Sequence, residues 1–325
     1  MRKASQEPAV AGLLARASAP FDRAGWWEGL AQHCDITPRY LLASGQGTML
    51  MPLTSVGGTA RPLANWYTFR WQPLISPGAG REALLCAAFA DLARSHWRIE
   101  LEQVPGEDGM AEVIASALGA TGWSTAISAH DINHVLPVGG RTFAAYLATR
   151  PGRLRATLKR KSARTACEVQ TAFSSEAWAS YEAVYAASWK GEEGSPAFLH
   201  ELAEAEGAAG RLRLGIGRID GEPVAAQLWT VEGGTAFIHK LAYREDARAH
   251  SPGTALTAAL MAHVIDLDRV DLVDFGTGDD PYKRDWMEQA RPRYRLSAFR
   301  PGNPRSWPYL ARRALCRLAP AAPGR

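Results

Sequence analysis

The order of helices and strands that the sequence predicts in its second half constrains the fold of this 325-residue chain most strongly. The expected elements are helices at 175–189 and 195–209, strands at 213–219, 223–231 and 236–243, a helix at 254–266, a strand at 270–275 and a helix near 282–288. Three consecutive strands joined by short turns form a meander. We therefore expect an α/β domain in which a mostly antiparallel sheet is flanked by helices.

The first half of the chain alternates short strands with helices. Residues 81–96 place apolar side chains three and four residues apart, which predicts an amphipathic helix. Segments separated by Gly and Pro predict two or three strands within 40–75, one of them at 65–71. At roughly 150 residues per domain, the length suggests two domains. We place them at 1–140 and 141–300, followed by a basic aromatic tail at 301–325.

The turn before the helix at 254–266 has the features of an anion-binding helix start. Ser251, Gly253 and Thr254 lie in its first turn. Backbone N–H groups are unpaired at a helix N-terminus, the helix dipole favours negative charge there, and glycine lets a phosphate approach the backbone. An ordinary capped helix start with an early proline is the alternative.

Three motifs carry a resemblance to a known family: Gly-Glu-Pro-Val-Ala-Ala-Gln at 221–227, Ser-Pro-Gly-Thr at 251–254 and DFGTGDDPYKRDWM at 274–287. With the order of elements, they resemble the acyl-CoA-binding core of the GNAT superfamily of N-acyltransferases. The resemblance is to the FemAB-related branch that includes acetyltransferases of cellulose and exopolysaccharide biosynthesis. It covers residues 140–300, whereas the first 140 residues match only as a divergent N-terminal half. It implies tandem GNAT-like α/β domains, each a mixed, mostly antiparallel sheet flanked by helices.

The resemblance also implies where the acyl donor binds. In GNAT folds the strand before the phosphate turn separates from its neighbour, and its backbone pairs with the pantetheine amides. The matching residues after Lys240 are Leu241, Ala242 and Tyr243, and the matching pyrophosphate positions are Arg248, His250, Ser251, Gly253 and Thr254. Acyl-CoA, either acetyl-CoA or a longer one, is therefore the expected co-substrate, without a metal. A charged tRNA donor, which some FemAB relatives use, is the alternative.

Acyl transfer to an amine requires a group that takes a proton from the ammonium and one that protonates or stabilises the departing thiolate. His239 lies on the strand before the donor turn and has a side chain that titrates near neutrality, so it is a candidate base, directly or through water. Strand alternation places His239 and Leu241 on one face and Lys240 and Ala242 on the other, so either His239 or Lys240 faces the cleft. A histidine satisfied at the sheet surface is the alternative.

The segment after the strand at 270–275 supplies further candidates. Asp274 and Asp279 are alternative bases or amine-binding carboxylates, unless the acidic loop only caps the next helix. The resemblance implies that Tyr282 lies near the thioester sulfur and acts as the general acid; an aromatic core residue is the alternative. Lys283 is expected to bind the acceptor or a donor phosphate, or to lie on a solvated surface.

Basic and aromatic residues gather in three further segments. Seven Lys or Arg and no acid occur at 150–164, which suits an anionic acceptor, a CoA phosphate, a membrane surface or a solvated face. The net charge of +4 and the lack of a binding motif argue against specific nucleic acid binding. Trp66 and Trp71 alternate on the strand expected at 65–71 and are candidate substrate contacts, with core packing as the alternative. The tail at 305–317 interleaves aromatic side chains and leucines with arginines, which suits an anionic bilayer or a helix docked on the second domain.

The cysteines and the N-terminus bear on the compartment. The four cysteines are far apart and form no Cys-x-x-Cys pair, which argues against a zinc module or a disulfide framework. Arg16 interrupts the apolar stretch of the first 20 residues, so a signal peptide is not expected. No uncharged apolar run approaches the roughly 18 residues of a membrane span. We expect a cytoplasmic protein that can contact the inner membrane peripherally.

Together these features predict an enzyme that transfers an acyl group from acyl-CoA to an amine by direct attack in a ternary complex. No cysteine lies in the predicted site to form an acyl-enzyme. The acceptor is either an amino sugar of an envelope polysaccharide or a long-chain amine such as a sphingoid base, and the N-terminal half would shape its groove. A FemAB-type aminoacyl-tRNA-dependent transferase and a catalytically inactive accessory protein of polysaccharide synthesis are the alternatives.

Overall fold

The helices and strands follow the α/β alternation that the sequence predicts. A computed structural model describes residues 8–318. Its helices are α1 (Pro8–Leu14), α2 (Ala24–His33), α3 (Arg81–Leu92), α4 (Met110–Ala120), α5 (Phe143–Ala148), α6 (Gly152–Lys161), α7 (Ser175–Ala186), α8 (Pro196–Ala208), α9 (Pro252–Ala262), α10 (Pro281–Trp286) and α11 (Trp307–Leu318). Its strands are β1 (Pro38–Gly45), β2 (Gly47–Val56), β3 (Thr59–Pro62), β4 (Leu74–Ile75), β5 (Arg98–Pro105), β6 (Ser124–Pro137), β7 (Ala166–Gln170), β8 (Leu212–Ile219), β9 (Glu222–Glu232), β10 (Thr235–Tyr243), β11 (Leu272–Thr277) and β12 (Gln289–Phe299).

All the described strands belong to one sheet that runs through both halves of the molecule. The strand order is β1-β2-β3-β5-β12-β6-β11-β10-β9-β8-β7, with β4 paired to β2. Most neighbours are antiparallel, and the exceptions are the parallel pairs β3–β5 and β10–β11. The expected mixed, mostly antiparallel α/β architecture is confirmed.

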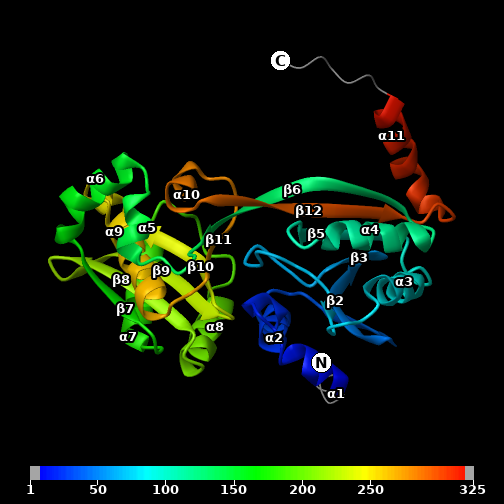
Figure 1. Cartoon of the computed structure of the whole chain (residues 1–325), viewed down its shortest axis with the longest axis horizontal. Coiled ribbons are helices and arrows are strands. Elements are labelled where there is room, and N and C mark those ends of the chain that lie inside the picture. The colour runs from blue at the N-terminus through cyan, green and yellow to red at the C-terminus, as the bar shows by residue number, and fades with distance from the viewer. Residues whose placement is uncertain (1–7, 319–325) are drawn as a thin grey trace.

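Two long strands join the halves. β6 pairs with β12 along most of its length and then reaches β11, where Pro137 lies opposite Leu272. Figure 1 shows β6 and β12 crossing together from one half to the other. The expected boundary near residue 140 does follow β6, but the range 141–300 needs correction. β12 lies within that range and returns to the first half, where it pairs with β5 as well as β6.

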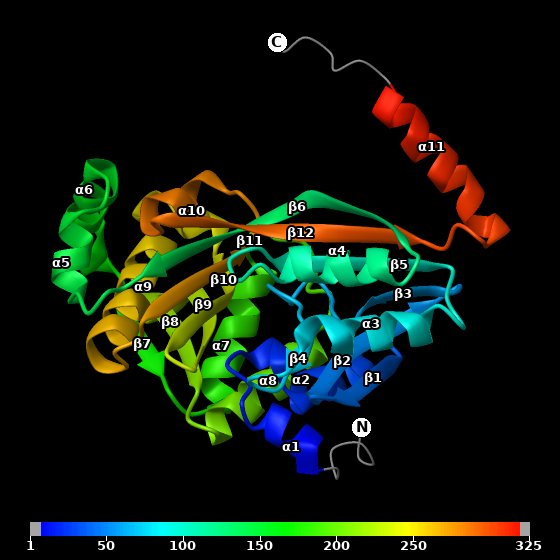
Figure 2. The same cartoon turned by 45° about the vertical axis from the view of Figure 1, so that its right-hand side comes forward.

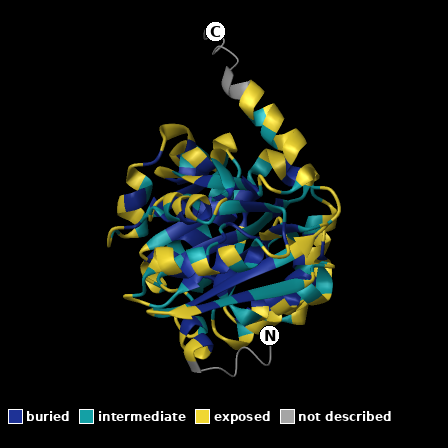
Figure 3. Cartoon of the chain, turned by 90° about the vertical axis from the view of Figure 1, so that its right-hand side faces the viewer, coloured by how far each residue is buried: buried dark blue, intermediate teal, exposed yellow. Residues whose placement is uncertain are grey.

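Helices cover both faces of the sheet formed by β7–β11. On one face α7 and α8 share a core with the N-terminal helices, which includes Trp26, Trp178 and Phe237. On the other face α9 packs with α5 and α6 around Tyr146 and Leu256. Figure 3 shows buried strands between helices whose outer faces are exposed. Because the N-terminal helices contribute to the core beneath α7 and α8, the two halves stabilise each other.

Two predicted segments differ in the structure. Residues 65–71 form an irregular loop instead of a strand, and burial does not alternate along them: Tyr67, Thr68 and Phe69 are all buried, whereas Trp66 is 62% exposed. The segment within the predicted tail forms α11, which projects from the body of the molecule (Figure 2). Within residues 8–318, no helix is long and apolar enough to cross a membrane.

Candidate active site

The strands β10 and β11 separate at the centre of the second half. They pair in parallel only from Thr235 to Phe237 on β10 and from Leu272 to Asp274 on β11. Beyond this point β10 continues along β9, whereas Thr277 of β11 pairs with Asn133 of β6. We call the end of this ladder, at Phe237 and Asp274, the splay point. The facing strand edges beyond it have no ladder between them, so their backbone groups are free for a bound chain.

A β-bulge follows the splay point on β10. Ile238 lies opposite Trp229 and Lys240 lies opposite Leu228, so His239 is the extra residue of the bulge. An extra residue reverses the alternation of side chains beyond it. His239 and Lys240 consequently both point to the side of the core that α7 and α8 share with the N-terminal segments, where His239 contacts Phe21 and Lys240 contacts Tyr67. The expectation that these two side chains lie on opposite faces is therefore wrong.

His239 lies in an aromatic cluster. Its ring is 5.4 Å from that of Phe69 and 6.0 Å from that of Trp26. Its Nε2 lies 2.8 Å from Thr230 Oγ1, while its shielded Nδ1 has no hydrogen-bond partner among the described residues. Burial lowers the pKa of His239 to about 3, so the imidazole is neutral at physiological pH.

Lys240 forms an ion pair with a residue that the sequence analysis missed. Its Nζ donates to Glu193 Oε1 at 2.8 Å and lies 4.6 Å from the centre of the Tyr67 ring. The Tyr67 hydroxyl donates to the same oxygen at 2.5 Å. Burial raises the pKa of Glu193, but these hydrogen bonds outweigh it and hold the pKa below its ordinary value. Glu193 is therefore ionised, and its buried Oε2 has no hydrogen-bond partner in the described part of the chain.

Asp274 is fully engaged in local hydrogen bonds. Asn133 Nδ2 lies 3.2 and 3.1 Å from its two carboxylate oxygens, and Gly276 N–H donates to Oδ1 at 2.8 Å. Burial raises the pKa of Asp274, partly offset by the nearby Arg293. The carboxylate joins β11 to β6 and fixes the turn into the next loop, where Gly276 adopts a φ of +70° against the Phe69 ring.

The loop and helix after β11 contain three predicted residues. Asp279 is at the surface, where it pairs with Arg284 and, at 2.8 Å, with His134; Arg284 lowers the pKa of its carboxyl. Tyr282 is 44% exposed, its ring packs edge-on against Phe275, and burial raises the pKa of its hydroxyl. Lys283 is buried and donates to the carbonyls of Thr277 and Gly278, so it holds the loop together.

A small pocket occupies the start of α9. It has a volume of about 230 Å³ and is lined by Tyr243, Arg248, Ser251, Pro252, Gly253 and Thr254. Ser251 adopts a left-handed φ of +54°, and Lys161 Nζ at the end of α6 donates to Ala249 O at 2.8 Å and to Ser251 Oγ at 3.3 Å. We call this the donor pocket. Glycine keeps the helix start open, because a Cβ on Gly253 would lie 3.1 Å from the Tyr243 ring. The open space and the N–H groups of the helix start fit a phosphate group.

The predicted donor residues divide around this pocket. Tyr243, Arg248, Ser251, Gly253 and Thr254 line it together. Leu241 packs with the core beneath α9, and Ala242 is buried on the opposite face, so these two can contribute only backbone groups. Two of the seven basic residues at 150–164 form ion pairs elsewhere: Arg150 pairs with Glu288 and Arg153 with Asp285.

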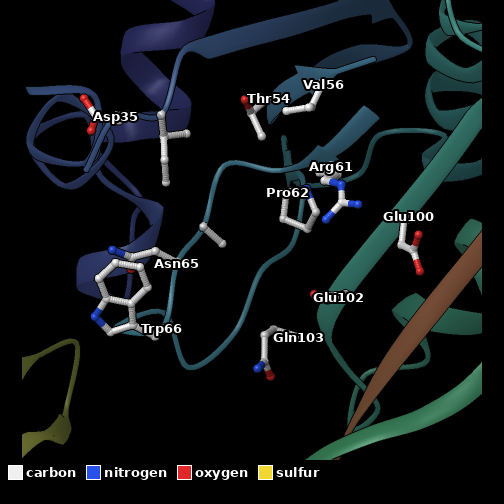
Figure 4. A pocket seen from close by; sticks show the side chains of 12 residues that line it. Asp35, Thr54, Val56, Arg61, Pro62, Asn65, Trp66, Glu100, Glu102 and Gln103 are labelled. Atoms are coloured by element: carbon white, nitrogen blue, oxygen red, sulfur yellow. The ribbon is translucent and has the colours of Figure 1, made fainter. Parts of the chain in front are cut away.

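Trp66 and Trp71 do not share a surface. Trp71 is buried, and its Nε1 donates to Pro52 O at 2.7 Å. Trp66 lines a polar pocket of about 380 Å³ in the first half. Figure 4 shows Trp66 and Asn65 on one side of it and Glu100, Glu102 and Gln103 of β5 on the other. The opposite edge of the Trp66 indole packs on Gly194, so this pocket borders the loop between α7 and α8.

The predicted catalytic residues do not form a bonded triad. No hydrogen bond or ring contact within residues 8–318 joins any two of His239, Asp274 and Tyr282. Glu193, which pairs with Lys240, lies outside the recognised motifs and is absent from the residues predicted from the sequence. The loop Gly-Glu-Glu-Gly at 191–194 was the available signal, but nothing in its spacing connects it to Lys240. Within the described residues, no group of three or more His, Cys, Asp or Glu side chains is placed to hold a metal ion.

Comparison with known proteins identifies the class. Residues 148–284 match the family model described as an acetyltransferase (GNAT) domain, and no curated protein matches the chain. The solved structure of FemX has a TM-score of 0.62 at 11% identity, covering 88% of this chain and 94% of FemX. The C-terminal domain (DUF2156) of a putative lysylphosphatidylglycerol synthetase from Agrobacterium fabrum has a TM-score of 0.60 at 14% identity, covering 100% of each chain.

A tandem GNAT protein from the clavulanic acid biosynthesis pathway has a TM-score of 0.54 at 16% identity, covering 92% of this chain and 98% of that one. At these identities the likenesses establish the fold, and the matched domain establishes the superfamily. Residues 148–284 are a GNAT acetyltransferase domain. The fold of the whole chain is similar to that of FemX and of a protein with two GNAT domains in tandem.

Proposed function

We propose that this protein is an acyl-CoA-dependent N-acyltransferase that acylates an amine of a cell-envelope component. One observation carries the proposal: the donor pocket at the start of α9 lies at the end of β10, on the same strand that separates from β11 at the splay point. A phosphate-binding helix start and a strand edge without a partner are thus in line, as an extended donor with a pyrophosphate requires.

The donor's anionic end would bind in the donor pocket. Arg248 lies in it, and Lys161 holds its loop from α6. The backbone of Leu241, Ala242 and Tyr243 would pair with the extended arm of the donor. The thioester would then lie at the splay point, between the β10 bulge and the start of α10.

In the proposed reaction the acceptor ammonium first loses a proton, and its nitrogen then attacks the thioester carbonyl. A C–N bond forms, the C–S bond breaks, and the thiolate takes up a proton to leave as free CoA. Tyr282 is our proposed acid, because its raised pKa keeps the hydroxyl protonated until the thiolate forms. Neither predicted base is placed to take this proton directly: His239 is buried among aromatic rings with a pKa of about 3, and both oxygens of Asp274 already accept hydrogen bonds, so the proton leaves to water.

The acceptor belongs to one of two classes, an amino sugar of an envelope polysaccharide or a long-chain amine. The polar pocket beside Trp66 suits a sugar, which stacks on an aromatic face and bonds to carboxylates and amides. Asp279 and Lys283 are the residues predicted to bind substrate. Asp279 forms an ion pair and Lys283 donates to backbone carbonyls, so we propose that both stabilise the loop before Tyr282.

We also propose that the protein is cytoplasmic and contacts an anionic bilayer through α11. Tyr309 stacks on Phe299 and Arg313 donates to Ser124 O, so that side of the helix is docked on the body. The other side exposes Trp307 and Leu315, 59% and 68% exposed. An apolar face flanked by arginines is the pattern of a helix that lies in a membrane interface.

An aminoacyl-tRNA donor is the second candidate. It is favoured by the fold likeness to FemX and by Lys159, Arg160 and Arg164, which form no ion pair within the described residues. A polyanionic donor of this kind would contact many more basic side chains than a pyrophosphate.

Release of free thiol tests the proposal. Purified protein is incubated with acetyl-CoA and long-chain acyl-CoAs, each with an amino sugar or a long-chain amine. We expect amine-dependent thiol release that pyrophosphate competitively inhibits. Transfer from charged tRNA without any thiol release would support the second candidate, and no transfer from either donor would indicate an inactive accessory protein.

A further inference from the structure

The largest of the pockets described lies between α7, α8 and the loop that joins them. It has a volume of about 600 Å³, within the range of small-molecule sites. Its wall is aromatic and aliphatic, made by Trp178, Tyr181, Tyr185, Pro196 and Leu199. Trp178 and Tyr181 are stacked with ring centres 4.8 Å apart. We call it the α7–α8 pocket.

The loop at one end of this pocket connects it to the donor pocket. Trp189 packs against Tyr243, with ring centres 4.2 Å apart, and Tyr243 lines the donor pocket. The next residues, Lys190 to Glu193, line the α7–α8 pocket. Glu193 also pairs with Lys240 on the β10 bulge. The loop therefore lies between the apolar pocket and β10, which it contacts through Glu193 and Trp189.

The charged groups of the pocket are mainly acidic and all lie at this end or at the rim. Glu182, Glu192 and Glu193 line it together with one cation, Lys190. Glu193 is ionised, and its buried Oε2 accepts no well-formed hydrogen bond within residues 8–318, although the Tyr185 hydroxyl lies near the carboxylate and helps to lower its pKa. An unpaired buried carboxylate oxygen is costly unless a donor reaches it. The tyrosine faces beside it also attract a cation, as they do the Lys240 ammonium.

We propose that the α7–α8 pocket binds the acceptor as a long-chain primary amine, with the alkyl chain along Trp178, Tyr181 and Leu199 and the ammonium at Glu193. This inference rests on the proposed function and selects one of its two acceptor classes. An amino sugar does not suit this pocket, because its hydroxyls would face aromatic and aliphatic walls without hydrogen-bond partners.

Burial lowers the pKa of Lys190 to about 8, with the neighbouring Lys240 adding to the effect. A lysine that is partly neutral near pH 8 competes weakly with the substrate ammonium for Glu193. The ammonium of Lys240 then remains as the main cation beside Glu193.

Binding without any acyl donor tests the inference separately from catalysis. Primary alkylamines of 8 to 16 carbons are titrated into the protein, and quenching of tryptophan fluorescence is recorded, with glucosamine as the comparison. We expect Kd to fall by roughly an order of magnitude over each few methylenes, as apolar burial predicts. No dependence on chain length, or equal binding of glucosamine, would overturn the proposal.

Two alanines of α7 provide a matched pair of variants. Both are exposed, but only Ala186 lines the pocket, and Ala183 does not. Ala186→Trp should weaken binding of the 16-carbon amine about tenfold by occupying the space of several methylenes, while Ala183→Trp leaves it unchanged. Glu193→Gln should weaken binding of the amine but not of the matching alcohol. The assignment would be contradicted if Ala186→Trp and Ala183→Trp changed the Kd of the amine equally. It would also be contradicted if Glu193→Gln weakened binding of the amine and of the alcohol equally.

Chain-length-dependent binding without thiol release would keep the pocket assignment and reject the proposed function. Thiol release with glucosamine alone would support the proposed function and reject the assignment of the pocket to a long-chain amine.

Discussion

At the residue scale, burial decides what the predicted site residues can do. The sequence predicts three catalytic residues, His239, Asp274 and Tyr282, from their residue types and their positions in the motifs. It does not show which distant side chains pack around them. Phe69 and Trp26 come from distant segments and enclose His239, and Asn133 occupies both oxygens of Asp274. Only Tyr282 has the exposure expected of a group that meets substrate.

The neutral state of His239 predicts how stability depends on pH. Its pKa is near 3 in the folded protein and near 6.5 in the unfolded chain, so the unfolded chain binds more protons between these values. Stability therefore falls as pH decreases through this window, by about 2 kcal/mol from this group between pH 7.5 and 5. Urea unfolding should show that His239→Gln removes this part of the pH dependence. An unchanged dependence in the variant would show that the imidazole is protonated in the fold.

Tyr282→Phe tests the proposed acid. Removal of the hydroxyl should lower kcat about a hundredfold and leave KM for acyl-CoA within twofold, because the group acts only on the leaving thiolate. The ring contact with Phe275 is retained, so the melting temperature should stay close to that of the wild type. A rise in KM at unchanged kcat would instead assign the tyrosine to donor binding.

At the scale of elements, the sequence predicted most of the second half, but two local features of the chain differ from the prediction. Sequence patterns placed α7–α9 and β8–β11 correctly, since the helices have apolar residues at helical spacing and the strands are short apolar runs bounded by turns, buried on both faces in β8 and β9. The bulge at His239 escaped prediction, because no residue there breaks the β pattern, and it turned Lys240 towards Glu193. The prediction of a strand at 65–71 was wrong, because the same spacing of aromatic residues also occurs in a loop that buries Trp71 and exposes Trp66.

The start of α9 gives a prediction for donor binding. Gly253→Ala places a Cβ 3.1 Å from Tyr243, so the ring must move and the pocket contracts. KM for acyl-CoA should rise roughly tenfold, because the pyrophosphate loses its close approach to the helix start. Gly152→Ala at the first turn of α6 is the control, since nothing lies within 4 Å of the added atom. Identical KM values for both variants would exclude the donor pocket from CoA binding.

The exposed side of α11 gives a prediction for the membrane. Leu315→Ala should reduce sedimentation of the protein with vesicles that contain an anionic lipid by several-fold, because apolar burial supports interfacial binding. Leu267 is 70% exposed elsewhere on the surface, and Leu267→Ala serves as the control. If the two variants sediment alike, α11 does not mediate bilayer contact.

At the scale of the whole molecule, the two GNAT-like halves form one sheet and share a core. β12 returns to the first half, and the N-terminal aromatic side chains of Phe21 and Trp26 pack on Phe237 and His239 of β10. Length and motifs suggested two domains with a boundary near residue 140. Contacts between segments far apart in the sequence cross this boundary and join the two halves. We expect a single cooperative unfolding transition, in which far-UV circular dichroism and tryptophan fluorescence coincide. Two separate transitions would show that the halves fold independently.

The central claim is that this fold joins an acyl group from a thioester to an amine. The most direct measurement supplies acyl-CoA labelled with ¹³C in its carbonyl group together with a long-chain amine, and examines the products by mass spectrometry. The account predicts a labelled amide in amounts equal to the free CoA released, and its loss in Tyr282→Phe. Label that remains in the thioester, with amide formed only when charged tRNA is supplied, would contradict it.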